Sequence, residues 1–203
     1  MRTLYILVLQ LFTASFCLAQ DNSFDEILSK ADKPPLVIKI YSQILSFSWP
    51  KGFTLGSRSE KEGAFSQVLK VVGESDDGWK QRILITGMQD ASVKEKDPVK
   101  LVSDLVKFSY KSGCPKSYSV TDVGEMKLDT GQRAFVFMVG CGITIPVENS
   151  EKNKMMTMAV VVKGSADVYS MLWSERSNTD EVPPLAWPVW RRRLDSLLPI
   201  QIH

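Results

Sequence analysis

Two cysteines, Cys114 and Cys141, bracket a stretch that reads CPKSYSVTDVGEMKLDTGQRAFVFMVGC. Within it, Tyr118–Leu128 and Gln132–Val139 have the composition of β-strands, and Asp129-Thr130-Gly131 between them is a typical hairpin turn. The stretch therefore predicts a β-hairpin region closed by a disulfide. Such a closed region limits how the rest of the chain can pack around it.

The first residues have the layout of a secretory signal peptide. Arg2 gives a positive start, Leu4–Phe16 is mostly apolar, and small residues precede a cleavage position after Ala19. The apolar run is shorter than the roughly 20 residues that span a bilayer. We therefore expect a cleaved signal peptide at 1–19, a single domain at 20–203, and a periplasmic or secreted protein.

Two alternatives to cleavage after Ala19 remain open at this stage. The N-terminal segment could stay attached as an uncleaved anchor. Cys17 could instead be lipidated, since Ala14-Ser15-Phe16-Cys17 resembles a lipobox.

Loss of residues 1–19 would leave Cys114 and Cys141 as the only cysteines. Exported chains meet an oxidising compartment, so this pair predicts one disulfide, which the chain-entropy model values at about 3–4 kcal/mol. A reactive or metal-binding pair is the alternative, but there is no CxxC spacing and no histidine nearby.

Charge is nearly balanced, with 25 basic and 23 acidic residues and a net charge of +2. No block of like charge stands out. We therefore expect no nucleic-acid partner and no stable membrane insertion of the mature chain.

The pattern of elements predicts an α+β fold, with a mainly antiparallel sheet, a central helix and a C-terminal helix packed on it, and one disulfide. The central helix is predicted from a cap at Asp97-Pro98 to Gly113, with apolar residues at helical spacing. Residues 53–63 are rich in glycine, serine and charge and predict an exposed loop. The other elements expected are a short helix near 23–33, strands at 36–49, 64–72, 79–86, 155–163 and 168–175, and a last helix at 189–198.

Residues for common catalysis are scarce. The only histidine is His203, the last residue, and terminal residues are usually mobile. A Ser–His–Asp or Cys–His arrangement is therefore not expected, and no phosphate-binding glycine motif is present. We predict that the protein is not an enzyme and carries no cofactor and no metal.

Two weaker chemical interpretations stay open. Met155, Met156, Met158 and Met171 could form a thioether site for monovalent copper, although methionines before a run of valines usually fill a core. The carboxylate pairs Asp76-Asp77 and Glu60/Glu62 could act as acid and base only if they converged across a cleft.

The last helix has two interpretations, and one of them is a partner contact. Arg191, Arg192 and Arg193 follow Trp187 and Trp190, and arginine and tryptophan are typical interface anchors. The alternative is a solvated helix face whose arginine stems cover apolar surface.

The segment Leu45-Ser46-Phe47-Ser48-Trp49-Pro50-Lys51-Gly52-Phe53 resembles the opening of domains in the PsbP-like superfamily, where a strand ends in a Pro-Lys/Asp-Gly-Trp/Phe turn. The resemblance implies an α-β-α sandwich and a non-enzymatic binding or accessory module, and it transfers no functional residue. The general plan also resembles many bacterial exported proteins, and some periplasmic immunity proteins have this size and build.

The leading hypothesis is therefore an exported, non-catalytic protein that binds a protein partner, as an immunity or envelope-system component. A carrier of an apolar small ligand would need an enclosed apolar cavity between sheet and helices. A carboxylate-based hydrolase would need a concave site with two or more convergent Asp or Glu side chains.

Overall fold

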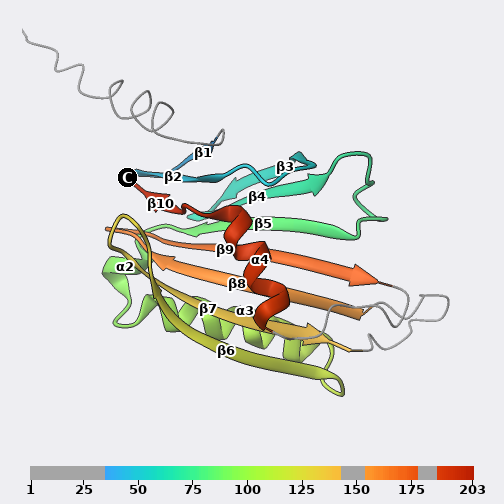
Figure 1. Ribbon diagram of the computed structural model, residues 1–203. Helices are drawn as coiled ribbons and strands as arrows, with labels where there is room; N and C mark the ends of the chain where they lie inside the picture. Colours follow the sequence, from blue (N-terminus) through green and yellow to red (C-terminus); the bar gives the residue numbers. More distant parts are fainter. Residues whose placement is uncertain (1–34, 143–153, 178–186) are drawn as a thin grey trace, which may run out of the picture. The chain divides into compact units, whose positions relative to one another are not determined.

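The computed structural model describes residues 35–142, 154–177 and 187–203 (Figure 1). All of them belong to the second of two units in the chain, Met1–Asp32 and Lys33–His203. The predicted signal peptide at 1–19, its cleavage site and the helix near 23–33 lie outside the described residues.

Ten strands form two antiparallel sheets in the described part of the chain. The larger sheet has seven strands in the order β3-β4-β5-β9-β8-β7-β6, and the smaller has the order β1-β2-β10. The strands are β1 (Pro35–Ile40), β2 (Gln43–Ser48), β3 (Phe53–Lys61), β4 (Ala64–Val71), β5 (Gln81–Met88), β6 (Tyr118–Lys127), β7 (Arg133–Cys141), β8 (Lys154–Lys163), β9 (Val168–Ser177) and β10 (Gln201–Ile202). The described helices are α2 (Ala91–Lys94), α3 (Pro98–Gly113) and α4 (Trp187–Leu197).

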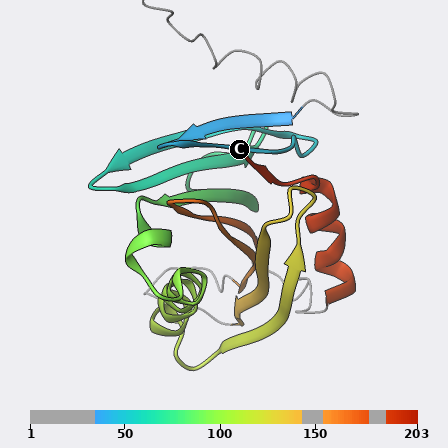
Figure 2. The same ribbon diagram turned by 90° about the vertical axis from the view of Figure 1, so that its left-hand side faces the viewer.

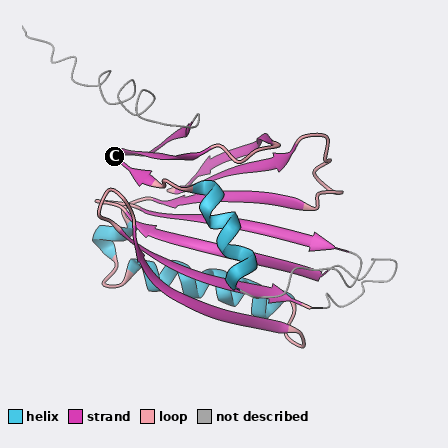
Figure 3. Ribbon diagram, viewed as in Figure 1, coloured by secondary structure: helices cyan, strands magenta, loops and turns pink. Residues whose placement is uncertain are grey.

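Alternate residues of β7 serve two separate cores, because successive side chains of a strand point to opposite faces of the sheet. Val136 and Met138 belong to the core that also holds Trp190 of α4 and the apolar residues of β1 and β2. Phe137 and Val139 belong to the core under α3. The seven-stranded sheet is thus covered by α3 on one face and by α4 with the small sheet on the other (Figures 2 and 3). The predicted α+β class is confirmed.

Helix α3 begins and ends where the sequence indicated. The Asp97 side chain accepts a hydrogen bond from the backbone N–H of Lys100, and Pro98 occupies the first turn. Val102 is buried against the sheet, while Leu105 and Phe108 are exposed. The helix exit is fixed at Cys114, whose backbone N–H donates to the Tyr110 carbonyl.

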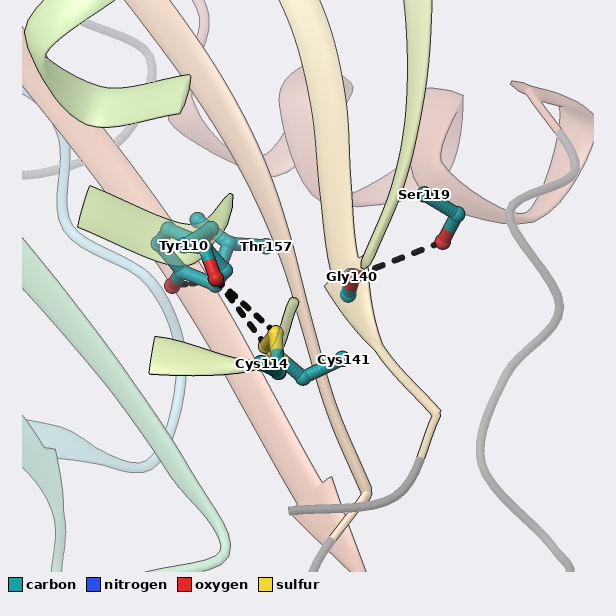
Figure 4. The surroundings of a disulfide bond; sticks show 6 residues. All are labelled: Tyr110, Cys114, Ser119, Gly140, Cys141 and Thr157. Atoms are coloured by element: carbon teal, nitrogen blue, oxygen red, sulfur yellow. Dashed lines mark hydrogen bonds between the residues drawn. A yellow bond between two sulfur atoms is a disulfide. The ribbon is translucent and has the colours of Figure 1, made fainter. Parts of the chain in front are cut away.

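The Cys114–Cys141 disulfide is present, with 5.8 Å between the two Cα atoms and a sequence separation of 27 (Figure 4). It joins the end of α3 to the last residue of β7, as predicted. Both cysteines are buried. Beside them, the Tyr110 hydroxyl is hydrogen-bonded to that of Thr157 on β8, which gives α3 a second attachment to the sheet.

Three expectations about local structure were wrong. Residues 53–63 form strand β3 and its turn rather than a loop, and the strand lies at an edge, so only Phe53 is buried along it. The strand expected over 36–49 is two strands, because Tyr41 has a φ of 54° and reverses the chain. Finally, the terminal His203 is anchored rather than free: its N–H donates to the Ile44 carbonyl at 2.9 Å, and the Ile44 N–H donates back at 3.0 Å.

Candidate binding site

Two of the five residues predicted to form a partner contact on α4, Trp190 and Arg193, instead stabilise the fold. Trp190 is fully buried in the core, so it offers no surface to a partner. The half-buried Arg193 binds the buried carboxylate of Glu175 through two hydrogen bonds, of 2.8 and 3.2 Å. Only Arg191 and Arg192 of the triplet are exposed, and Trp187 is partly buried. The five residues therefore do not form one contact surface, and Trp190 is corrected from a contact to a core residue.

Three of the four methionines singled out in the sequence lie in the core or against it. Met158 and Met171 are fully buried in the core shared with α4, and Met156 packs against it. The sole histidine ring lies 3.5 Å from the Ser46 hydroxyl, with Gln201 on the same hydroxyl. Ser46 is itself buried, so this pair has no open approach for a substrate.

A cavity of about 920 Å³ lies beside α3 and is the candidate site. Four parts of the chain wall it: the first turns of α3, the strand pair β6–β7, the turn between β8 and β9, and the start of β2. Its lining residues are Gln43, Asp97, Val99, Lys100, Ser103, Asp104, Lys107, Asp122, Glu125, Gln132, Arg133, Ala134, Phe135, Lys163, Gly164 and Ser165.

Opposite charges alternate along the wall that α3 and β6 share. Lys107 of α3 reaches Asp122 of β6 at 2.6 Å, and its ammonium lies 5.4 Å from the centre of the Phe135 ring. Lys100 pairs with Asp104 one turn further along the helix at 2.5 Å. This hydrogen bond to Asp104, and its charge, raise the pKa of Lys100. The wall offers paired charges of both signs around an apolar patch.

The opposite end of the cavity rests on a buried polar cluster. Asp167 accepts the Asp90 backbone N–H at 2.8 Å and the Tyr169 hydroxyl at 3.0 Å. The pKa of Tyr169 is raised above 10.0, first because it is buried and then because of the Asp167 charge and hydrogen bond. The same hydroxyl lies 3.4 Å from Oε1 of Gln43. Asp167 and Gln43 are both at least nine-tenths buried, so this cluster fixes one end of the cavity.

The carboxylates singled out in the sequence do not line this cavity. Asp76 pairs with Lys70 and Glu60 lies near Arg58, and both acids are exposed. The cavity has four other acids, Asp97, Asp104, Asp122 and Glu125, which the sequence reasoning missed. A signal existed for the helical ones, because acids and lysines recur at positions 97, 100, 104 and 107 of a predicted helix.

Comparison with known proteins gives a limited result. No family model matches the chain, and no curated protein matches it. The solved structures similar to it include PA94 of Pseudomonas aeruginosa, a protein of unknown function, with a TM-score of 0.42 at 12% identity over 81% of this chain and 96% of that one. Another is the Ran-binding protein Mog1p of Saccharomyces cerevisiae, with a TM-score of 0.47 at 13% identity over 84% and 95%. At these values neither protein's role can be transferred, and the PsbP-like resemblance of residues 45–53 stays a prediction.

Within the described residues, no helix combines the length and apolarity needed to cross a membrane.

Proposed function

We propose that this protein is a non-catalytic binding protein that engages a segment of a partner polypeptide in the cavity beside α3. One observation carries the proposal: four acids and four bases line the same cavity around the apolar side chains of Val99, Ala134 and Phe135. A polypeptide segment brings charges of both signs and apolar groups, so it can match such a wall along its length.

The same lining argues against the two other candidate functions. A carrier for an apolar ligand needs an enclosed pocket. Half of these sixteen lining residues are charged, and Lys100, Asp104 and Asp122 are each more than half exposed. A carboxylate hydrolase needs a free acid and base. Here Asp104 and Asp122 are paired with lysines and more than half exposed, and Asp97 caps the helix.

Export to the periplasm or outside the cell is part of the proposal. The disulfide between Cys114 and Cys141 supports it, because such bonds persist mainly in oxidising compartments. The predicted signal peptide at 1–19 would take the chain there. Immunity to a toxin, or service to an envelope system, is the most concrete role compatible with a non-catalytic exported binding protein.

Affinity capture with a charge-reversal variant tests the binding site. Lys100 is 68% exposed at the cavity rim, so Lys100→Glu alters the wall without disturbing the core. We expect the protein captured from periplasmic extract by the wild-type chain to be lost with this variant. Lys51→Glu is the matched control, since Lys51 is exposed in the β2–β3 turn and does not line the cavity.

Lys51→Glu should unfold at the urea midpoint of the wild type, and Lys100→Glu, which loses its exposed pair with Asp104, should cost no more than about 1 kcal/mol. Urea unfolding therefore separates loss of binding from loss of fold. Retention of the captured protein by Lys100→Glu, or its equal loss from Lys51→Glu, would reject the cavity as the binding site.

A further inference from the structure

Gln43, the first residue of β2, lines the cavity, and hydrogen bonds fix the oxygen end of its side-chain amide. Its Oε1 accepts the backbone N–H of Ser165 at 3.0 Å and lies 3.4 Å from the Tyr169 hydroxyl. A backbone N–H can only donate, so the oxygen must face the β8–β9 turn. The orientation of the amide is therefore fixed, and its nitrogen is directed elsewhere.

That nitrogen has no hydrogen-bond partner among the described residues. Gln43 is only 8% exposed, and a buried N–H group without a partner is destabilising. In the described part of the chain, two side-chain nitrogens are completely buried and have no hydrogen-bond partner. They are Arg82 Nε and Trp173 Nε1. The Gln43 nitrogen is not among them, so it is not fully sealed from solvent, and Gln43 is one of the residues that line the cavity.

The ammonium group of Lys163 is a second hydrogen-bond donor next to the β8–β9 turn. Lys163 ends β8 and lines the cavity, and no carboxylate among the described residues pairs with it. The other three lining bases, Lys100, Lys107 and Arg133, each have one. Gly164 follows Lys163, and any side chain at this glycine would collide with the Gln43 Oε1 atom. The glycine thus lets the turn close directly against the Gln43 amide.

We infer that this end of the cavity, between Gln43 and Lys163, binds a carboxylate group of the partner segment. The inference rests on the proposed binding function and specifies its chemistry. The amide N–H groups and the ammonium are all donors, and together they carry a single positive charge, which one carboxylate neutralises. A phosphate dianion would exceed that charge, and the buried carboxylate of Asp167 lies behind the amide.

Two short peptides that differ in one group provide the test. The ¹⁵N-labelled mature protein is titrated with acetyl-Gly-Glu-Gly-amide and, separately, with acetyl-Gly-Gln-Gly-amide. We expect the Gln43 side-chain NH₂ signals to shift with the glutamate peptide only. Lys163→Gln is expected to weaken that binding about fivefold, as for loss of an exposed ion pair. Lys51→Gln, a matched change outside the cavity, should leave it unchanged.

Equal shifts with both peptides, or no shift of the Gln43 signals with either, would overturn the carboxylate assignment. These outcomes leave the capture experiment untouched, because Lys100→Glu tests the cavity wall independently of Gln43 and Lys163. Failure of the carboxylate site is thus distinguishable from failure of the proposed function.

Discussion

Replacement of Arg193 by alanine is the sharpest test of how the last helix is used. The guanidinium of Arg193 donates from Nε to Oε1 of Glu175 at 2.8 Å and from a terminal nitrogen to Oε2 at 3.2 Å. The Arg193 side chain is 23% exposed and that of Glu175 only 7%. The variant would leave the Glu175 carboxylate buried without its counter-charge.

The cost follows from that stranded charge. Removal of one partner of a buried ion pair typically costs 3–5 kcal/mol, and the partial exposure of Arg193 places the expected loss near the lower end, at about 3 kcal/mol. Arg191 provides the control within the same helix. It pairs with Asp195 one turn away at 2.8 Å, with both side chains about half exposed. Arg191→Ala should therefore cost about 0.5 kcal/mol or less.

Urea unfolding monitored by tryptophan fluorescence measures both values. A third variant, Arg193→Ala combined with Glu175→Gln, removes the stranded charge and should recover part of the loss. If Arg193→Ala and Arg191→Ala unfold at the same midpoint, the buried ion pair does not stabilise the helix, and the structural role given to Arg193 is refuted.

Three further predictions concern stability. Reduction of the Cys114–Cys141 bond should lower the free energy of unfolding by about 3–4 kcal/mol, and detection of two free thiols in the unreduced native protein would exclude the bond. Because the folded-state pKa of Tyr169 is raised above 10.0, the unfolded chain loses its tyrosine proton first, and stability should fall as pH rises above about 10. Tyr169→Phe should flatten this alkaline decline in a urea–pH series, and an unchanged slope would contradict it. Deletion of residues 201–203 removes the buried Ile202 and the paired Ile44–His203 backbone bonds, so thermal unfolding should shift several degrees lower, whereas an unchanged midpoint would show that β10 contributes nothing.

The sequence predicted those parts of the fold where local signals and burial agree. Helix α3 has the predicted capping aspartate and the proline in its first turn. Of its apolar stripe, Val102 is buried against the sheet, whereas Leu105 and Phe108 are exposed. Strand β7 follows the same rule, because Phe135–Val139 is apolar at every position. It is covered on both faces, by α3 and by the core that contains α4.

Prediction failed where a partner distant in the sequence decides the outcome. Strand β3 is an edge strand, so one neighbour, β4, orders a segment whose composition resembles a loop. Trp190 shares a helix with three arginines, and nothing in that pattern shows that its side of the helix faces the core that also contains Phe47 and Trp173. The pairing of His203 with Ile44 is equally distant in the sequence.

The cavity could not be predicted from the sequence either, because its walls come from segments that are distant in the sequence. Gln43, Lys100 and Lys163 come from three separate segments, and only the sheet order brings the β8–β9 turn to the start of α3. Gln43 in particular reads as an ordinary polar position at the start of a strand. The proposed role of its amide nitrogen as a donor follows from the Ser165 N–H, which is hydrogen-bonded to the amide oxygen.

The disulfide and the cavity lie at opposite ends of α3, and this arrangement would give the bond a role in the proposed binding without any chemistry of its own. Cys114 holds the helix exit, and the Tyr110–Thr157 hydrogen bond holds its last turns against β8. At the other end, Lys100 and Asp104 form the cavity wall. A helix fixed to the sheet at its end and buried along Val102 keeps that wall in position before a partner arrives, which lowers the entropic cost of binding. The cysteine pair is therefore a positional constraint on the site.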